Sequence, residues 1–249
     1  MERAALPGRL TWHLATVVGT VEETPRARTL VLDVPGWSGH RAGQHVDVRL
    51  TAEDGYRAQR AYSIASAPDD PHLALTVERL DDGEVSPYLV DELRVGDELE
   101  LRGPIGGYFV WDGSSDAPVL LVAGGSGVVP FRAMLRHHVA AGDGAPVRLL
   151  HSARSLDEVI YRDELAELAE ESSVDVRITL TRTWPSSWDG LRGRIDAATL
   201  AEAAWPASDN PLTFVCGPTG LVEAVAAALV GQGHDPARIK TERFGPTGS

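Results

Sequence analysis

The sequence predicts two folded parts, an antiparallel β-structure followed by a doubly wound α/β structure. At 249 residues the chain is longer than a single hydrophobic core usually supports. Residues 9–111 read as short strands between turns, with almost no helical periodicity, whereas residues 118–244 alternate strands with helices. A short polar stretch at 111–116 separates the two patterns. We therefore predict one domain over residues 1–112 and a second over residues 113–249.

Closely spaced strands in the first domain predict an antiparallel barrel or sandwich. The one helical signal lies at residues 86–93, where Pro87 occupies a helix-opening position behind Ser86 as the candidate cap. The strands are expected at residues 10–21, 29–34, 45–50, 58–67, 72–80 and 97–101.

The second domain is predicted to be a parallel sheet with helices on both faces. Its first strand, residues 118–123, is apolar throughout, as expected where both faces of a strand are buried. Ser155 and Glu158 form a capping box for a helix running to about residue 169. Such a doubly wound sheet, here of five parallel strands, binds ligands at the carboxyl ends of its strands. Further strands are expected at 147–151, 174–181, 212–216 and 239–244, and further helices at 128–141, 197–204 and 220–230.

The composition excludes several classes of partner and site. Net charge is −13 at pH 7 and both predicted domains are acidic, so nucleic acid is not an expected partner. No apolar run approaches the roughly 20 residues of a membrane-spanning helix, and no signal-peptide core opens the chain, so we predict a cytoplasmic protein without membrane insertion. The single cysteine, Cys216, excludes an intramolecular disulfide and a Cys-ligated iron–sulfur cluster within this chain. The eight histidines are scattered, and no metal site is predicted.

Residues 60–63 offer a cation, an aromatic ring and a hydroxyl on one predicted strand. Alternation places Arg60 and Tyr62 on one face and Ala61 and Ser63 on the other. An arginine can form a forked contact with a pyrophosphate, an aromatic ring can cover an isoalloxazine, and a hydroxyl can donate to a ring nitrogen. This strand is therefore a candidate flavin site, with an ordinary surface strand as the alternative.

A glycine turn leads directly into the predicted helix at 86–93. Free N–H groups at a helix N-terminus suit a diphosphate when a nearby glycine lets the ligand approach the backbone. The candidate residues are Gly83, Val85 and Ser86, and an ordinary capped turn is the alternative.

A second glycine-rich stretch follows the first strand of the predicted parallel sheet. Its candidate residues are Gly124, Gly125, Ser126 and Gly127, which lead from the strand into the next helix. The spacing departs from the G-x-G-x-x-G dinucleotide pattern, and a simple tight turn could have the same residues. Its place after the first parallel strand favours a dinucleotide site.

Two further groups of candidates lie near the ends of the last predicted strands. Cys216, Gly217 and Pro218 follow one strand, where the thiol would face the crevice beside the glycine loop, and a buried inert cysteine is the alternative. Glu242 is a candidate hydrogen-bonding group at a hydride-transfer site, and Phe244 is a candidate cover for one flavin face. A terminal strand with one core aromatic would explain both of these residues equally well.

These motifs occur in one order along the chain and, with the glycine-rich residues 103–109, resemble those of the ferredoxin:NADP reductase superfamily. The resemblance extends from about residue 10 to residue 245. It implies a six-stranded FAD-binding barrel followed by a pyridine-nucleotide domain. It also implies that Arg60 pairs with the FAD diphosphate, that Tyr62 packs on the flavin and that Ser63 bonds near flavin N5.

The same resemblance implies roles for the glycines and the cysteine. Gly83 and Ser86 match a diphosphate turn, and Cys216 matches a cysteine beside nicotinamide C4. The matching nucleotide loop consists of Gly124, Gly125 and Gly127.

The chain departs from the family pattern in two places. Ser126 and Val128 stand where Thr and Ile are frequent, which is a conservative change. Plant-type members end on a tyrosine that stacks on the flavin, whereas this chain continues for five residues beyond Phe244. The roles of Glu242 and Phe244 therefore stay open.

The nucleotide preference depends on residues after the second parallel strand, where similar proteins meet the adenosine ribose. Arg154, with Arg182 and Tyr161, is a candidate site for a 2′-phosphate, and no acidic residue at the strand tip favours a free 2′-hydroxyl. Both arginines could instead be solvated surface charges. NADPH is therefore the predicted electron donor, with NADH as the alternative.

The sequence predicts an NAD(P)H-dependent flavoprotein reductase that transfers hydride to FAD and then passes electrons singly to a separate protein. Ser63, Cys216 and Glu242 are the candidate catalytic residues. Ferredoxin, flavodoxin, a cytochrome P450 and an oxygenase component are all open as acceptors. One alternative is a reductase of a small acceptor such as a quinone, a ferric chelate or free flavin. Another is a flavin- or nucleotide-binding relay subunit of a larger redox complex.

Overall fold

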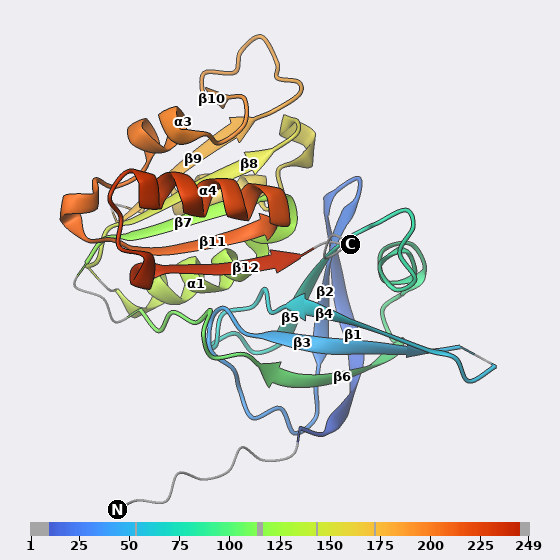
Figure 1. Ribbon diagram of the computed structural model, residues 1–249. Helices are drawn as coiled ribbons and strands as arrows, with labels where there is room; N and C mark the ends of the chain where they lie inside the picture. Colours follow the sequence, from blue (N-terminus) through green and yellow to red (C-terminus); the bar gives the residue numbers. More distant parts are fainter. Residues whose placement is uncertain (1–9, 53, 114–116, 143, 172, 245–249) are drawn as a thin grey trace, which may run out of the picture.

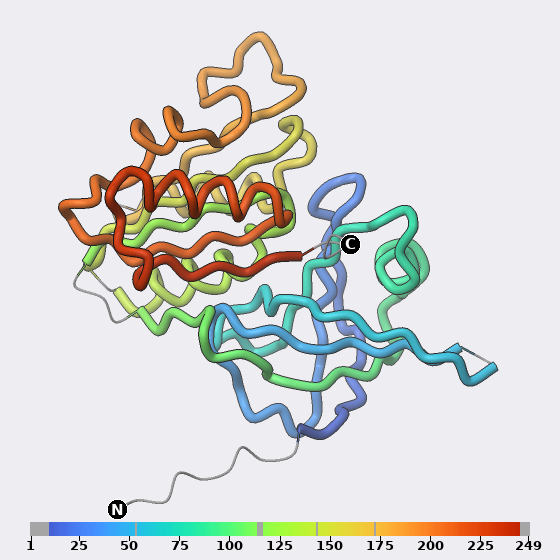
Figure 2. Tube along the Cα trace, in the orientation of Figure 1, coloured from blue at the N-terminus to red at the C-terminus, as the bar shows by residue number. Residues whose placement is uncertain are grey.

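The computed structural model consists of an antiparallel sheet and a parallel sheet that pack against each other (Figure 1). Figure 2 follows the chain from the antiparallel part, coloured blue to green, into the parallel part, coloured green to red. The structure describes residues 10–52, 54–113, 117–142, 144–171 and 173–244.

The antiparallel part is a closed barrel, as predicted. In the described part of the chain its six strands pair in the order β4-β3-β6-β1-β2-β5. A bridge between Ile64, just after β4, and Leu75 of β5 joins the two edges of this sheet. The strands are β1 Trp12–Thr24, β2 Ala27–Asp33, β3 His45–Thr51, β4 Arg57–Ser63, β5 Leu73–Glu78 and β6 Glu98–Ile105.

The barrel core follows from alternation along its strands. Leu30 and Leu32 of β2, and Val46 and Val48 of β3, are fully buried, while the residues between each pair are partly exposed. Burial of one such side chain stabilises the fold by about 1.5–3 kcal/mol. Alternation therefore determines which side chains of β3 and β4 face away from the barrel core, toward the parallel sheet.

The helical signal at residues 86–93 is realised as a single π-helical turn, η1 Tyr88–Glu92. Ser86 does not cap this turn, because its Oγ accepts a hydrogen bond from the backbone N–H of Leu80 at 3.0 Å. The predicted Ser86 cap is therefore wrong. The hydroxyl instead closes the preceding turn, residues 80–86, a local bond that serine commonly forms with the backbone.

The parallel part is a sheet with the order β10-β9-β8-β7-β11-β12 in the described residues. The strand order reverses at β7, which has β8 on one side and β11 on the other, and such a switch point is where doubly wound sheets bind ligands. The prediction of five strands missed β10, which contributes only two residues at one edge. The strands are β7 Val119–Gly124, β8 Val147–Ala153, β9 Val174–Leu180, β10 Leu191–Arg192, β11 Leu212–Pro218 and β12 Ile239–Phe244.

Helices cover both faces of this sheet, as the doubly wound class predicts. In Figure 1, α3 and α4 lie in front of the sheet and α1 lies behind it. Leu121 of β7 is buried with side chains of α1 and α2, whereas Leu120 and Val122 are buried with side chains of α3 and α4. The helices are α1 Val129–Ala141, α2 Arg162–Leu168, α3 Ala197–Ala203 and α4 Thr219–Gly231, with short 3-10 turns η2 Gly125–Val128, η3 Leu156–Glu158, η4 Ala207–Asp209 and η5 Pro236–Arg238.

The predicted capping box of Ser155 and Glu158 is wrong. Ser155 makes no side-chain cap, and the chain there forms only the 3-10 turn η3. α2 begins later, at Arg162, after Tyr161 adopts a left-handed conformation with φ of 61°. The helix starts late because Tyr161 is drawn into the boundary between the two sheets, where its hydroxyl donates to Thr76 Oγ1 of the barrel.

Three aromatic side chains join the end of the barrel to the parallel part. Phe109 lies edge-on to Phe214 of β11, with ring centroids 5.3 Å apart, and 5.9 Å from the ring of Phe131 in α1. Phe131 and Phe214 are fully buried, and Phe109 nearly so. Such pairs stabilise by about 0.5–1.5 kcal/mol beyond the area they bury. The barrel is therefore attached to the parallel sheet through a packed contact.

The helices of the described residues are too short or too polar to cross a bilayer.

Replacing Phe109 should show how much this aromatic contact contributes to the stability of the protein. We expect Phe109→Ala to lower the free energy of unfolding by about 3–5 kcal/mol, because a buried aromatic leaves a cavity that cannot fully collapse. Denaturant unfolding followed by tryptophan fluorescence measures the change. Tyr88→Ala is the control, since Tyr88 is an aromatic residue of η1 that is 37% exposed. Equal losses in the two variants would show that the aromatic contact contributes little.

Candidate functional site

The candidate site lies where the carboxyl ends of the parallel strands meet the barrel. β12 points from the parallel sheet toward the barrel in Figure 1. At this meeting point Glu242 Oε1 of β12 lies 3.9 Å from His45 Nδ1 of β3. A Cβ added to Gly125, just after β7, would lie 3.6 Å from Glu78 Oε2 of β5. Glu242 and the glycine loop of the parallel sheet therefore lie close to strands of the barrel.

Arg60 and the turn at residues 83–86 are brought together, as their predicted shared role requires. Arg60 Nη2 donates to Glu84 Oε2 at 2.8 Å, and Arg60 is 52% exposed. A Cβ on Gly83 would lie 2.8 Å from Ser86 Oγ, so only glycine fits this turn. Val85 is buried in the barrel core, so it can offer a ligand only its backbone. A guanidinium beside a compact turn suits a diphosphate.

Tyr62 and Ser63 face opposite sides of β4, as alternation predicts. Tyr62 pairs across the sheet with Val46 and packs against the barrel core, and Ser63 pairs with His45. Burial raises the pKa of Tyr62 to about 12, so its hydroxyl stays protonated at neutral pH. Ala61, between Arg60 and Tyr62, is exposed and adds little bulk. The strand thus offers a flat ring on one face and a small hydroxyl on the other.

The glycine loop is held between its two neighbouring strands. A Cβ on Gly127 would lie 2.1 Å from the carbonyl oxygen of Cys216 in β11. On the other side, His151 of β8 lies with Nε2 3.2 Å from the carbonyl oxygen of Gly125. A carbonyl only accepts, so Nε2 carries the proton, and burial lowers the pKa of His151 to about 4, which keeps the ring neutral. Gly124, Gly125, Ser126 and Gly127 therefore form a backbone-lined turn of fixed shape.

Cys216 and Glu242 are neighbours across the pairing of β11 with β12. Cys216 is fully buried in the apolar cluster beside α1, and burial followed by the charge of Glu242 raises the pKa of its thiol well above the usual value. The thiol is therefore protonated and poorly nucleophilic. Phe244 packs partly against the same cluster, opposite Pro218. Gly217 precedes Pro218 at the end of β11.

His45 belongs to this site and was missed in the sequence. It shares a face with Ser63 through strand pairing and approaches Glu242 across the domain boundary. Burial dominates both groups, because it raises the pKa of Glu242 to about 7 and lowers the pKa of His45, with Asp47 opposing the latter. Near pH 7 the Glu242 carboxyl is therefore partly protonated, and the lowered pKa of His45 favours a neutral ring in the 3.9 Å contact. Only the register of β3 against β4 could have indicated His45.

Glu242 also carries an unused acceptor. Its Oε2 is buried and has no hydrogen-bond partner among the residues that the structure describes. A buried carboxyl oxygen without a partner costs free energy and is often reserved for a ligand.

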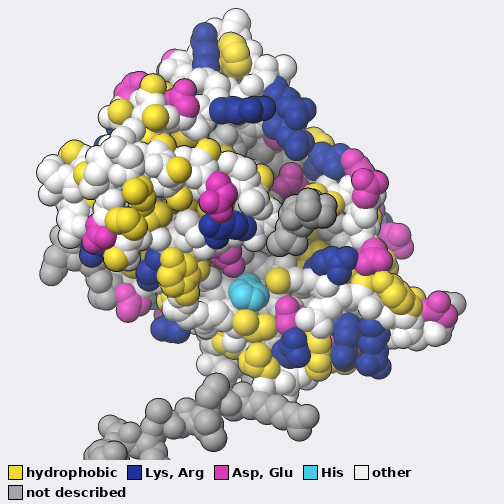
Figure 3. All heavy atoms as spheres, viewed as in Figure 1, with side chains coloured by type: hydrophobic (Ala, Val, Ile, Leu, Met, Phe, Trp, Pro, Cys, Tyr) yellow, Lys and Arg dark blue, Asp and Glu magenta, His cyan; other side chains and the backbone are white. Residues whose placement is uncertain are grey.

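Arg154 and Arg182 lie side by side at the carboxyl ends of β8 and β9. The backbone N–H of Arg182 donates to the carbonyl of Arg154 at 2.9 Å, and both side chains are exposed. Figure 3 shows Lys and Arg side chains gathered over this end of the parallel sheet. Tyr161 cannot join them as predicted, because it is 2% exposed and its hydroxyl is bonded to Thr76. Of the three residues predicted for a 2′-phosphate, only the two arginines lie together.

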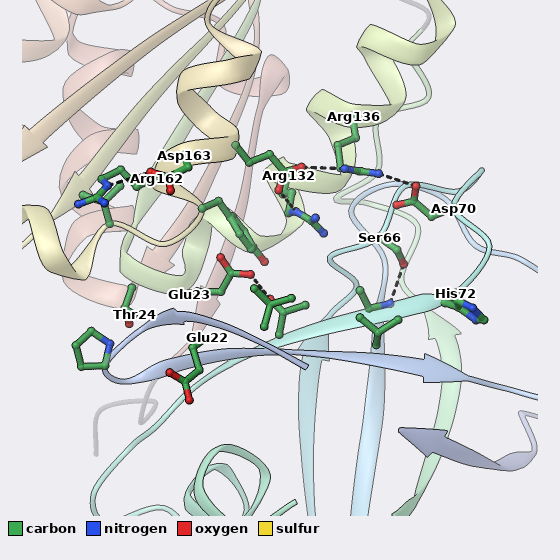
Figure 4. A pocket seen from close by; sticks show the side chains of 18 of the residues that line it. Glu22, Glu23, Thr24, Ser66, Asp70, His72, Arg132, Arg136, Arg162 and Asp163 are labelled. Atoms are coloured by element: carbon green, nitrogen blue, oxygen red, sulfur yellow. Dashed lines mark hydrogen bonds and ion pairs between the residues drawn. The ribbon is translucent and has the colours of Figure 1, made fainter. Parts of the chain in front are cut away.

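A cavity of about 730 Å³ lies between the barrel and α1 and α2 (Figure 4), and of the predicted site residues only Tyr161 lines it. Arg132 lines this cavity and donates hydrogen bonds to Glu164 at 2.6 Å and to the carbonyl of Ala65 at 3.1 Å. Its guanidinium carbon lies 4.9 Å from the centroid of the Tyr161 ring. Arg136 adds bonds to Glu164 and to Asp70 of the barrel. These paired charges join the two domains, and the cavity is separate from the candidate site.

Fold and site together define a two-domain oxidoreductase that uses a flavin and a pyridine nucleotide. The family model described as "Oxidoreductase FAD-binding domain" matches residues 16–110, which contain Arg60 and the turn at 83–86. The model described as "Oxidoreductase NAD-binding domain" matches residues 121–227, which contain the glycine loop and Cys216.

Known relatives agree with these matches. Ferredoxin–NADP reductase B of Sorangium cellulosum is 40% identical over 210 residues, which are 82% of this chain and 84% of that protein. The FAD/NAD-binding domain of nitric oxide dioxygenase from Vibrio cholerae has a solved structure with a TM-score of 0.84 and 29% identity, covering 94% of this chain and 99% of that one. The chain belongs to the ferredoxin:NADP reductase superfamily.

A third relative is longer than this chain. The glycine betaine monooxygenase reductase subunit of Pseudomonas aeruginosa is 33% identical over 240 residues, which are 94% of this chain. The match spans 65% of the length of that subunit.

Adding a methyl group to Gly127 should damage the nucleotide loop. We expect Gly127→Ala to weaken NADP⁺ binding by at least about tenfold, because the new Cβ would overlap the carbonyl of Cys216 and displace the loop. Calorimetric titration measures the binding. Gly144→Ala is the control, since a Cβ there meets no atom within 4 Å. Unchanged binding in Gly127→Ala would show that the loop does not hold the nucleotide.

Glu242 should make the flavin-free protein less stable as the pH rises from about 4.5 to about 7. The folded protein keeps this carboxyl protonated up to a pKa of about 7, whereas the unfolded chain ionises it at the ordinary 4.5. The unfolded state binds fewer protons over this window, so the free energy of unfolding falls, by at most about 3 kcal/mol. His45, whose lowered pKa acts in the opposite sense, is present in wild type and variant alike.

Denaturant unfolding at several pH values compares wild type with Glu242→Gln, which lacks this decline. Glu223→Gln serves as control, because Glu223 is exposed and paired with Arg243 on the surface. A difference between wild type and Glu242→Gln that does not vary with pH would show that Glu242 ionises normally.

Proposed function

We propose that the protein is an NAD(P)H-dependent reductase that transfers hydride to bound FAD and passes electrons singly to a separate protein. One observation carries the proposal: the barrel and the parallel sheet approach each other at His45 and Glu242, whose Nδ1 and Oε1 atoms are 3.9 Å apart. His45 pairs with Ser63 in the barrel, and Glu242 pairs with Cys216 in the parallel sheet. Residues 1–112 would bind the flavin and residues 113–249 the nucleotide. Bound FAD would supply the conversion of a two-electron donation into single-electron steps.

The chain's own residues would bind and orient the two rings. Arg60 would hold the diphosphate beside Gly83 and Ser86, and Tyr62 would pack on the flavin. Ser63 would donate a hydrogen bond near N5 of the flavin ring. These assignments are supported by the position of each side chain on β4 and on the adjoining turn.

On the nucleotide side, Cys216 and Glu242 would frame the nicotinamide. Cys216 would offer a small uncharged wall, and Glu242 the acceptor Oε2 that has no partner in the described structure. Phe244 would cover part of the same place. Alignment of two rings with water excluded accounts for most of what a protein adds to such a reaction.

NADPH is the donor that we favour. Arg154 and Arg182 offer two cations where the adenosine ribose would lie, and paired arginines are well suited to a phosphate. NADH stays the alternative, because both side chains are exposed and Arg154 already lies 3.6 Å from Glu158.

The acceptor is proposed to be a ferredoxin, a flavodoxin, a cytochrome P450 or an oxygenase component in the cytoplasm. Two relatives support a protein acceptor of this kind, since one is a ferredoxin–NADP reductase and the other a monooxygenase reductase subunit.

Anaerobic titration of the FAD-loaded protein with NADPH, and separately with NADH, tests the proposed function. The flavin absorbance bands should bleach with either or both nucleotides, and with NADPH at the lower concentration. A protein that holds FAD but is bleached by neither nucleotide would contradict the proposal and favour a relay subunit.

Arg154 should discriminate between the two nucleotides. We expect Arg154→Gln to raise the concentration of NADPH needed for half-bleaching by about tenfold and to leave that of NADH nearly unchanged, because only NADPH carries the 2′-phosphate. Arg162→Gln is a control, since Arg162 is exposed and paired with Asp163 on α2. Equal effects on both nucleotides would remove Arg154 from the phosphate site.

A further inference from the structure

Both carboxylate oxygens of Glu84 are engaged by side chains of the β4 region. Arg60 Nη2 donates to Oε2 at 2.8 Å, and the hydroxyl of Tyr56 donates to Oε1 at 2.9 Å. Glu84 lies between Gly83 and Ser86, in the turn proposed to hold the flavin diphosphate. The side chains are about half exposed, at 50% for Glu84 and 57% for Tyr56.

This contact differs from the other ion pair of the same turn. Asp81 is neutralised by Arg26 at 3.0 Å and by Arg79 at 2.6 Å, neither of which has a proposed role in ligand binding. The partner of Glu84 is instead Arg60, the residue proposed to bind the diphosphate. Glu84 therefore presents to Arg60 the same kind of anionic oxygen that a phosphate would present.

We propose that Glu84 competes with the flavin diphosphate for Arg60 and thereby weakens the binding of FAD. The inference rests on the proposed function, since it takes the ligand of Arg60 to be the diphosphate of a flavin dinucleotide.

The guanidinium of Arg60 is already engaged at both of its terminal nitrogens. Its Nη1 already donates to the carbonyl of Gln59 at 2.7 Å, and its Nη2 to Glu84. A diphosphate must either displace the carboxylate from Nη2 or share the cation with it. In either case the Glu84 carboxylate stays close to the negative charges of the diphosphate, and this repulsion disfavours the FAD-bound state.

The size of the effect is limited by exposure. Water and salt screen charges on half-exposed side chains, so the competition shifts the affinity for FAD without abolishing it. In the flavin-free protein the same contact has a favourable consequence, because it holds the turn at 83–86 against β4 while the diphosphate is absent. The turn that would bind the diphosphate is therefore held in place before FAD binds.

Titration of FAD into the flavin-free full-length chain tests this competition. Flavin fluorescence quenching gives the dissociation constant, independently of any turnover. We expect Glu84→Gln to bind FAD about threefold to tenfold more tightly than wild type, whereas Glu84→Asp, which keeps the charge, should stay close to wild type. Asp81→Asn is the matched control, because it removes a charge from the same turn without touching Arg60, and its affinity should also stay close to wild type.

A second comparison asks whether the gain passes through Arg60. In an Arg60→Gln background, adding Glu84→Gln should bring no further tightening, because the competition requires the guanidinium. A misfolded variant would lose affinity, so a gain cannot arise from damage to the fold.

The inference is overturned if Glu84→Gln binds FAD as wild type does or more weakly, or if Asp81→Asn gains as much as Glu84→Gln. In each of these outcomes wild type still binds FAD, so the proposed function stands. If neither wild type nor any variant binds FAD, the proposed function fails as well.

Discussion

The contact between the two sheets is the constraint on which the rest of the structure depends. Neither sheet holds a complete site, since Ser63 and His45 lie on the barrel and Cys216 and Glu242 on the parallel sheet. These groups face one another only because the aromatic side chains around Phe109 and the polar contacts around Arg132 hold the sheets together. Packing far from the chemistry thus determines the geometry of the chemistry.

Burial favours the neutral form of several ionisable groups at the candidate site. Burial keeps the thiol of Cys216 protonated, the ring of His151 uncharged, and the carboxyl of Glu242 protonated up to a pKa of about 7. Charged side chains lie at the margins instead, at Arg60 on one side and Arg154 on the other. Flat uncharged rings would therefore meet a neutral centre, and phosphates a charged rim.

Local sequence patterns predicted much of this arrangement. Period-two alternation identified the barrel strands, and the apolar run before Gly124 identified β7 as buried on both faces. The glycine loop was proposed because glycines follow the first parallel strand and lead into a helix, and the structure places a carbonyl 2.1 Å from where a Cβ of Gly127 would lie. These patterns depend only on residues that are close together in the sequence, so they can be recognised without the structure.

The rest depended on contacts between distant residues. Ser86 and Ser155 both stand in favourable capping positions, yet one hydroxyl bonds Leu80 and the other makes no cap. Tyr161 follows β8 at a plausible distance from a ribose, but tertiary packing turns it toward Thr76. His45 has no motif of its own, and its place beside Ser63 comes from strand register alone. For Ser86 and Tyr161, a partner elsewhere in the fold took the group that the local pattern had assigned to another role.

Arg132 has a consequence for how the two domains are held together. Its side chain donates hydrogen bonds to Glu164 and to the carbonyl of Ala65. It also lies over the ring of Tyr161, whose hydroxyl donates to Thr76. Because the interactions share Arg132 and Tyr161, they form one connected set that runs from α1 and α2 to the barrel. Loss of the Arg132 side chain would therefore weaken several contacts between the domains at once.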